Sequence, residues 1–145
     1  MKAGELCTRE VVTAWAGESV VDAARRMRDH DVGTVVVVED VDGVTRPVGL
    51  VTDRDLVMRV LARGEPLAAL LRDVMDPALV TATEDDDVDT VLARLRRRAV
   101  RRVPIVDRTG ALRGVLSLDD IVGWISEELR DAVRLIERQA PPHAR

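Results

Sequence analysis

The chain has 145 residues, of which 46% are hydrophobic and 33% are charged, and its formal net charge is −4 at pH 7. This apolar fraction excludes an intrinsically disordered chain, and the sequence has no uninterrupted apolar run long enough for a transmembrane helix. The sole cysteine, Cys7, cannot form an internal disulfide, so we expect a soluble protein of the reducing cytoplasm. One cysteine and two histidines offer little to a thiol–imidazole pair or a zinc site, which argues against an enzyme.

The first half of the chain predicts the order strand, helix, strand, strand, helix. Its first helix begins after Ser19, a good N-cap, and carries apolar residues at helical spacing. The run Thr34–Val38 is rich in valine and too short for a helix, so it favours a strand. The turn Asp42-Gly43 precedes the next strand. In chain order the expected strands lie at 11–14, 34–38 and 48–51, and the second helix begins at Thr52.

The second half repeats this pattern. Thr13-Ala14 aligns with Thr81-Ala82, 68 residues later, and Gly49–Leu56 matches Gly114–Ile121. We therefore predict an α/β (α+β) fold of two β-α-β-β-α repeats packed with pseudo-twofold symmetry, because neither repeat is large enough to be comfortable alone. The expected segments are 5–66 for repeat 1, 72–126 for repeat 2, 127–140 for a C-terminal amphipathic helix and 141–145 for a flexible tail.

Three motifs carry a family resemblance. They read Gly-Leu-Val-Thr-Asp-Arg-Asp-Leu at 49–56, Arg-Arg-Val-Pro-Ile-Val-Asp at 101–107 and Gly-Val-Leu-Ser-Leu-Asp-Asp-Ile at 114–121. The chain resembles a pair of cystathionine-β-synthase (CBS) domains, a Bateman module, over roughly residues 5–126. This resemblance implies a cleft between the repeats, a flat homodimer, and binding of AMP, ADP, ATP, S-adenosylmethionine or NAD. It also implies a protein partner that the module regulates, and it implies that the module requires no cofactor.

The pairs Thr52/Asp55 and Ser117/Asp120 stand where a strand enters a helix. Each fits a capping box, in which the hydroxyl and the carboxylate satisfy backbone amides. The same geometry could bind a ligand, because a helix N-terminus favours phosphate and a carboxylate can accept ribose hydroxyls. The resemblance implies that these aspartates contact ribose.

The resemblance implies further ligand-binding positions. Those expected around adenine are Thr13, Ala14, Val35, Thr81, Ala82, Val103 and Pro104. Arg101 and Arg102 precede a predicted strand, and the resemblance places this basic pair at phosphates, which guanidinium groups bind well. Arg54 could compensate in the first repeat, where Gly33-Thr34 replaces the basic pair. We therefore expect two unequal sites.

Two alternative functions remain open. The arginines between Arg94 and Arg102 could bind nucleic acid, although Arg94, Arg96 and Arg97 are more typical of a solvated helix face. The chain could instead be a purely structural dimerisation module with closed clefts. The acidic run Glu84–Asp87 precedes a predicted helix and favours capping over metal binding, so no metal or catalytic residue is predicted.

An apolar stripe lies beyond the repeats, on the predicted C-terminal helix. Its members follow helical spacing: Ile125, Leu129, Ala132, Val133 and Ile136. Such a stripe must be covered, either by the repeats of the same chain or by a second copy, and the sequence leaves both open.

Overall fold

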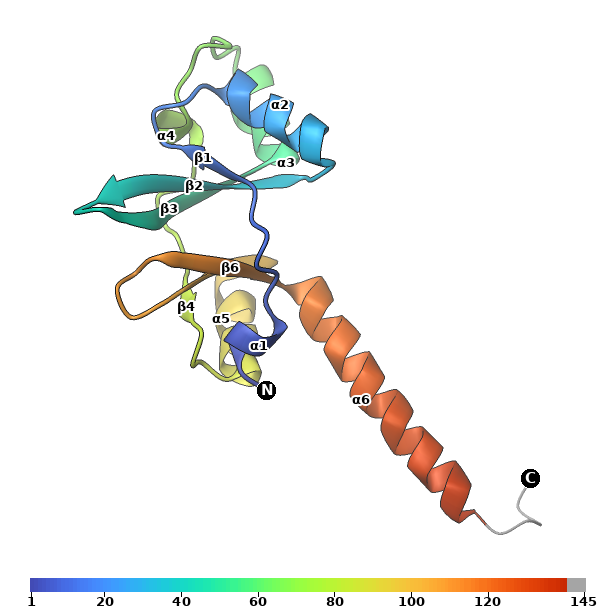
Figure 1. The fold of residues 1–145 in the computed structure, drawn as a ribbon. Helices are drawn as coiled ribbons and strands as arrows, with labels where there is room; N and C mark the ends of the chain where they lie inside the picture. Colours follow the sequence, from blue (N-terminus) through green and yellow to red (C-terminus); the bar gives the residue numbers. More distant parts are fainter. Residues whose placement is uncertain (141–145) are drawn as a thin grey trace.

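The computed structural model describes residues 1–140, and the expected tail at 141–145 lies outside them. Two three-stranded sheets face each other, with helices on their outer sides (Figure 1). The strands are β1 (Thr13–Trp15), β2 (Thr34–Val41) and β3 (Val44–Thr52) in one sheet and β4 (Ala82–Thr83), β5 (Arg102–Val106) and β6 (Leu112–Ser117) in the other. The helices are α1 (Ala3–Leu6), α2 (Val20–His30), α3 (Asp53–Asp55), the π-helix η1 (Leu56–Leu61), α4 (Leu71–Val74), α5 (Val88–Arg98) and α6 (Leu118–Gln139). The predicted order β-α-β-β-α, twice, is confirmed.

The two sheets have the same topology. In each, the first strand runs parallel to the second, and the second pairs antiparallel with the third. The β2–β3 turn places Asp42 and Gly43 at φ 54° and 78°, the left-handed values that match the twist of a hairpin. The strands of this hairpin are longer than those of the β5–β6 hairpin, and its turn is shorter than the loop 107–111 that joins β5 to β6.

Each sheet has its own hydrophobic core on its outer face. Val35, Val37 and Val51 pack under α2 in the first core, and Val103 and Ile105 pack in the second. The intervening residues point to the opposite face, toward the other sheet. Both faces are thus buried, which explains why the strands read as continuous valine runs.

The segment before each repeat packs on the other repeat. Ala3 and Cys7, from the N-terminal segment, lie in the second core, whereas Leu71, from the segment between the repeats, lies in the first. The chain crosses at Thr8, whose backbone forms two hydrogen bonds with Val115 of β6, at 2.9 and 3.0 Å. The two units are therefore interlocked through their entry segments.

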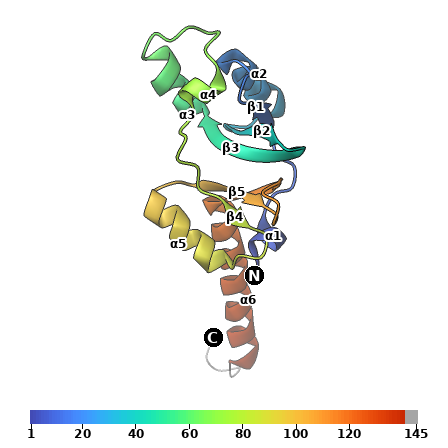
Figure 2. The ribbon, with the colours of Figure 1, turned by 90° about the vertical axis from the view of Figure 1, so that its left-hand side faces the viewer.

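Helix α6 packs on the second unit only at its N-terminal end, and the rest of the helix extends beyond that unit. Ile121 is buried, whereas every residue from 125 to 140 is exposed. Both views show the helix projecting away from the two units (Figures 1 and 2). Of the two alternatives for its apolar stripe, packing against the repeats of the same chain is therefore excluded for the described residues. Within residues 1–140, none of the helices combines the length and apolar character needed to cross a membrane.

Candidate functional site: a cleft between the repeats

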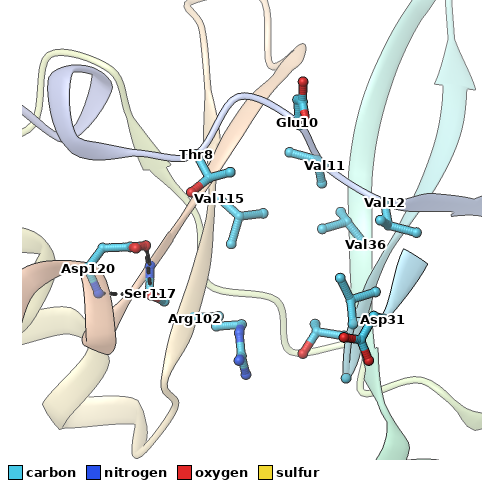
Figure 3. Close-up of a pocket in the computed structure, with 13 residues that line it drawn as sticks. Thr8, Glu10, Val11, Val12, Asp31, Val36, Arg102, Val115, Ser117 and Asp120 are labelled. Carbon is cyan, nitrogen blue, oxygen red and sulfur yellow. Dashed lines mark hydrogen bonds between the residues drawn. The ribbon is translucent and has the colours of Figure 1, made fainter. Parts of the chain in front are cut away.

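A cavity of about 360 Å³ lies between the two units. One wall comes from the second unit, and the other comes from the N-terminal segment and the start of β2 (Figure 3). The lining residues are Thr8, Glu10, Val11, Val12, Asp31, Val32, Gly33, Thr34, Val36, Arg102, Val115, Ser117 and Asp120. Residues far apart in the sequence thus form one site, which is lined by both apolar and polar side chains.

The capping box of α6 forms one end of the cavity. The Ser117 hydroxyl accepts a hydrogen bond from the Asp120 backbone N–H at 3.0 Å. Asp120 Oδ2 accepts from the Ser117 N–H at 2.9 Å and from its hydroxyl at 2.7 Å. Oδ1 of Asp120 has no hydrogen-bond partner among the described residues, so it remains available to a ligand. The capping interpretation is confirmed, and it leaves half of the carboxylate unused.

The corresponding box of the first unit has the same geometry but a different neighbour. Asp55 Oδ2 accepts from the Thr52 N–H at 2.9 Å, and the Thr52 hydroxyl accepts from the Asp55 N–H at 3.1 Å. Oδ1 of Asp55, however, lies 3.6 Å from Nε of Arg59, one turn along the helix. In the second unit the position equivalent to Arg59 is Trp124, which cannot form an ion pair. The two aspartates therefore differ in their availability.

Charge at the cavity is mainly acidic. Arg102 is its one cationic lining residue, and it pairs with Ser117 across the β5–β6 register. Three carboxylates accompany it, from Glu10, Asp31 and Asp120. Arg102 points into the space between the two units (Figure 3). The lining thus carries a formal excess of negative charge.

Arg101 and Arg54 lie away from this cavity. Arg101 is exposed and forms an ion pair with Asp119 at 3.1 Å. Arg54 is exposed on the short helix α3, where its N–H donates to the Asp53 side chain. Neither lines the cavity, so of the three arginines expected at phosphates only Arg102 does.

Several predicted adenine contacts are core residues. The side chains of Ala14, Val35, Ala82 and Val103 are each at most 1% exposed and lie in the two cores. The cavity is instead lined by their neighbours Val11, Val12, Thr34 and Val36. Alternation along a strand turns adjacent residues to opposite faces, so these four side chains point into the cores and away from the cavity.

The remaining predicted positions have structural partners or lie on the inner face. The carbonyl oxygen of Thr13 accepts a hydrogen bond from Arg26, and that of Thr81 accepts one from Arg94. Pro104 is buried in β5, between two residues that face the second core, and it therefore faces the first unit. Thr13, Thr81 and Pro104 do not line the cavity.

The arginine-rich stretch is not a uniform solvated face. Arg94 forms an ion pair with Asp86 at 2.6 Å as well as its bond to Thr81, so the expectation for Arg94 is wrong. Arg96 and Arg97 are exposed, as predicted. The same arrangement occurs in the first unit, where Glu18 pairs with Arg26 and the hydrogen bond from Arg26 lowers the pKa of Glu18.

The carboxylates of the acidic run before α5 form ion pairs with different cationic residues and do not converge on one point. Glu84 pairs with Arg9 at 2.5 Å, and Asp87 pairs with Lys2 at 2.8 Å. Among the described residues, no three histidine, cysteine, aspartate or glutamate side chains gather closely enough to hold a metal ion. Cys7 is 9% exposed and burial raises the pKa of its thiol, which makes it a packing residue.

Comparisons with known proteins agree with this architecture. The family model for the CBS domain matches residues 3–62 and again 71–127. The CBS domain-containing protein YhcV of Bacillus subtilis is 32% identical over 122 residues, which cover 83% of this chain and 84% of YhcV.

Two solved structures share the fold. The CBS domain protein PAE2072 from Pyrobaculum aerophilum, complexed with AMP, has 27% identity and a TM-score of 0.74, covering 83% of this chain and 89% of that one. The CBS domain pair of protein MJ0100, in complex with 5′-methylthioadenosine and S-adenosyl-L-methionine, has a TM-score of 0.76 at 22% identity, covering 88% of this chain and 98% of that one, and supports the fold alone. The chain described here belongs to the CBS-domain family and contains a tandem pair of CBS domains.

Proposed function

We propose that this protein is a non-catalytic regulatory module that binds an adenosine-containing ligand in the cleft between its repeats. The observation that carries the proposal is the free Oδ1 of Asp120 at the N-terminus of α6, in the wall of the 360 Å³ cavity. A carboxylate in this position can accept the two hydroxyls of a ribose. The AMP bound to PAE2072, a relative with the same fold, supports this ligand class.

The cavity offers a place for each part of such a ligand. The apolar side chains of Val11, Val12 and Val36 would contact the base. Asp120 would accept the ribose hydroxyls, and the 5′ substituent would extend toward Arg102. These positions replace the buried core valines expected from the sequence as the contacts of the base.

The charges of the cleft favour one group of adenosine-containing ligands. A triphosphate would bring several negative charges beside Glu10, Asp31 and Asp120, with Arg102 as the single cationic lining residue. Like charges held close together in a partly enclosed site repel each other. We therefore propose a ligand with at most one phosphate, such as AMP, or with a cationic 5′ group, such as S-adenosylmethionine.

Ligand binding at the two capping boxes, Thr52/Asp55 and Ser117/Asp120, would be unequal. A ligand at Asp55 must compete with Arg59 for the carboxylate, whereas Asp120 has no such competitor among the described residues. We therefore propose that the site at Ser117 and Asp120 is the one that fills first.

Thermal unfolding with a panel of adenosine, AMP, ATP, S-adenosylmethionine and NAD tests the proposal. At about 100 times its Kd a ligand adds about 2.7 kcal/mol, which raises the Tm by about 5–10 °C. Asp120→Ala should weaken binding at least about tenfold, since a hydrogen bond to a charged group is lost. Asp55→Ala is the matched control and should retain the shift.

If no compound in the panel at millimolar concentration raises the Tm or gives calorimetric heat, the module has a structural role and the proposal is wrong. Equal losses in Asp55→Ala and Asp120→Ala would contradict the ranking of the two capping boxes. ATP binding more tightly than AMP would contradict the charge argument.

We further propose that the module acts in the cytoplasm as a homodimer and that ligand binding changes its contact with a regulated protein. The net charge of −4 and the pairing of Arg94 with Asp86 leave little support for nucleic-acid binding.

A further inference from the structure

The chain crosses between the two units twice, and the two crossings begin in the same way (Figures 1 and 2). The first crossing comprises residues 2–12, and the second comprises residues 70–80. Their backbone contacts correspond at an offset of 68 residues: the hydrogen bonds from Cys7 to Ala3 and from Met75 to Leu71, both at 2.9 Å, and the bridges Lys2–Asp87 and Leu70–Ser19. Each crossing therefore reaches the edge of the opposite sheet along an equivalent path.

The equivalence ends one residue later. Thr8 exchanges two backbone hydrogen bonds with Val115 of β6, at 2.9 and 3.0 Å. The corresponding residues of the first unit, Asp76 and Leu50 of β3, form neither bond within residues 1–140. The first crossing is thus joined to β6, whereas the second passes β3 without joining it.

Leu50 therefore presents an unused edge of the sheet. Its partner in β2 is Val36, whose N–H donates away from β3, to the carbonyl oxygen of Val12 at 3.0 Å. In an antiparallel pair, the backbone groups of both residues point either toward each other or outward, so the N–H and C=O of Leu50 point outward. These are the two groups that, at Val115, bond to Thr8.

A turn within the second crossing replaces the missing bonds. Ala78 N–H donates to Asp76 Oδ1 at 2.9 Å, so the chain bends at the residue that corresponds to Thr8. Arg59 Nη1 donates to the carbonyl oxygen of Val74, just before the bend, at 3.3 Å. Two hydrogen bonds thus hold the bent course, one from within the crossing and one from η1.

The side chain of Met75 fills the space between the bend and β3. A Cβ added at Gly49 would lie 2.5 Å from Met75 Sδ, and its nearest neighbours all belong to that side chain. At the equivalent Gly114, such an atom would lie 2.8 Å from the backbone oxygen of Thr8. The methionine therefore occupies the position that backbone takes at β6, and its flexible side chain can leave it.

Arg59 connects the bend to the carboxylate of the first capping box. Its Nε lies 3.6 Å from Asp55 Oδ1, while its Nη1 holds the carbonyl oxygen of Val74. Arg59 belongs to the π-helix η1, whereas the equivalent Trp124 belongs to the regular helix α6. Single π turns inside helices occur frequently at functional sites. The unit that has the arginine is thus the one whose crossing does not join the sheet.

We propose that residues 75–78 form a strap with two positions, bent and closed, and that Arg59 holds it in the bent one. In the closed position, the backbone of Asp76 would form with Leu50 the two hydrogen bonds seen at β6. Closure exchanges the bonds made by Arg59 and by the Asp76 side chain for two backbone bonds. The number of hydrogen bonds is therefore conserved, and a change at Arg59 shifts the balance between the positions.

Closure would complete the site at Asp55. Residues 8 and 10–12 of the first crossing line the cavity beside Asp120, and residues 76 and 78–80 correspond to them in the second. A ligand that engages the Asp55 carboxylate removes one of the two contacts of Arg59 and thereby favours the closed strap. This role rests on the proposed function, whereas the two positions of the strap do not.

Hydrogen exchange of the isotope-labelled full chain, followed by NMR without ligand, tests the strap. In the wild type the Leu50 amide should have a protection factor at least about tenfold lower than that of Val115, because it lacks a backbone acceptor. Arg59→Leu removes one contact of the bend, and the double variant Met75→Cys/Asp76→Thr gives the strap the residues found at positions 7 and 8. Each variant should raise the protection factor of Leu50 at least about tenfold.

Arg63→Leu, one turn further along the chain from Arg59, is the matched control. Arg63 is exposed and forms no hydrogen bond or ion pair within residues 1–140, so the exchange of Leu50 should stay as in the wild type. Equal protection of Leu50 and Val115 in the wild type would show that the edge of β3 is not open. Unchanged exchange of Leu50 in both strap variants would show that these contacts do not hold the bend. Either result overturns the proposal.

These measurements need no ligand, so they are independent of the proposed function. In an Asp120→Ala chain, Arg59→Leu should restore a rise in Tm with AMP, because it frees Asp55 and closes the strap. A protected Leu50 without a restored rise would overturn the role of the strap at this site. The absence of any ligand-induced rise in the wild type would overturn the proposed function alone.

Discussion

Gly114 lies where the N-terminal segment crosses β6, and replacing it by alanine tests how closely the two units are interlocked. A Cβ at this position would lie 2.7 Å from Cys7 Sγ and 2.8 Å from the carbonyl oxygen of Thr8. Both neighbours are fixed, because Cys7 is buried and the backbone of Thr8 is hydrogen-bonded to Val115. The added methyl group therefore has to displace backbone.

The repeat provides a matched control at Gly49. A Cβ there would lie 2.5 Å from Met75 Sδ, the far part of a long side chain with several rotatable bonds. Overpacking a close contact costs about 1–3 kcal/mol. We expect Gly114→Ala to lower the free energy of unfolding by about 2–3 kcal/mol and Gly49→Ala by about 1 kcal/mol. For a chain of this length the first loss corresponds to a Tm lower by about 6 °C.

Urea unfolding followed by circular dichroism measures both losses. Since Thr8 and Val115 also line the cleft, Gly114→Ala should in addition reduce the ligand-induced rise in Tm, and Gly49→Ala should not. If Gly114→Ala lies within 0.5 kcal/mol of the wild type, or is more stable than Gly49→Ala, the close approach of the N-terminal segment to β6 is not as described.

Two further variants address polar contacts outside the cleft. Hydrogen bonds to its carboxylate, the largest from Thr109, hold the pKa of Asp107 well below its usual range. The ionised carboxylate therefore contributes to the free energy of unfolding above the pKa near 4 that it has in the unfolded chain, and this contribution is lost as the pH falls below that value. In urea titrations the wild type should therefore be more stable than Asp107→Asn at pH 7, with a difference that narrows toward pH 3. A constant difference would contradict this linkage. Arg94→Ala should lower the free energy of unfolding by about 1–2 kcal/mol because the Thr81 carbonyl loses its donor, whereas the exposed control Arg96→Ala should lie within about 0.5 kcal/mol of the wild type.

The architecture was predictable because local signals agree with the fold. The Ser19, Thr52 and Ser117 caps mark three helix starts, and each forms the reciprocal pair of hydrogen bonds that its sequence predicts. The Asp42-Gly43 turn likewise has the positive φ values that those residues favour. Repetition of the pattern then predicts two similar units.

The face of each strand residue could not be predicted with the same precision. Strand β2 is valine from Val35 to Val38 and is buried on both faces, so composition does not show which valines point toward the cleft. A polar residue breaks this ambiguity, because Thr34 lines the cavity and alternation then places Val36 beside it. Reading outward from Thr34 would have selected Val36 in place of Val35.

Contacts between segments that are distant in the sequence could not be predicted either. Arg94 belongs to a run of arginines, and its bond to the carbonyl oxygen of Thr81 depends on how β4 lies against α5. The packing of Ala3 and Leu71 on the opposite repeats depends on where the chain crosses between units. Periodicity reports which face of an element is buried, but not which element buries it.

The difference between Asp55 and Asp120, in contrast, can be read from the repeat itself. Asp55 aligns with Asp120, and the residue one helical turn later is Arg59 in the first repeat and Trp124 in the second. An arginine at this spacing reaches the aspartate of its own helix, as the 3.6 Å contact shows, whereas an indole cannot neutralise a carboxylate. The capping boxes are preserved in both repeats because both helices need them, so the position next to the box decides which carboxylate remains free for a ligand. In a duplicated fold, the residues that break the repeat around a shared motif are thus the first place to look for differences in binding.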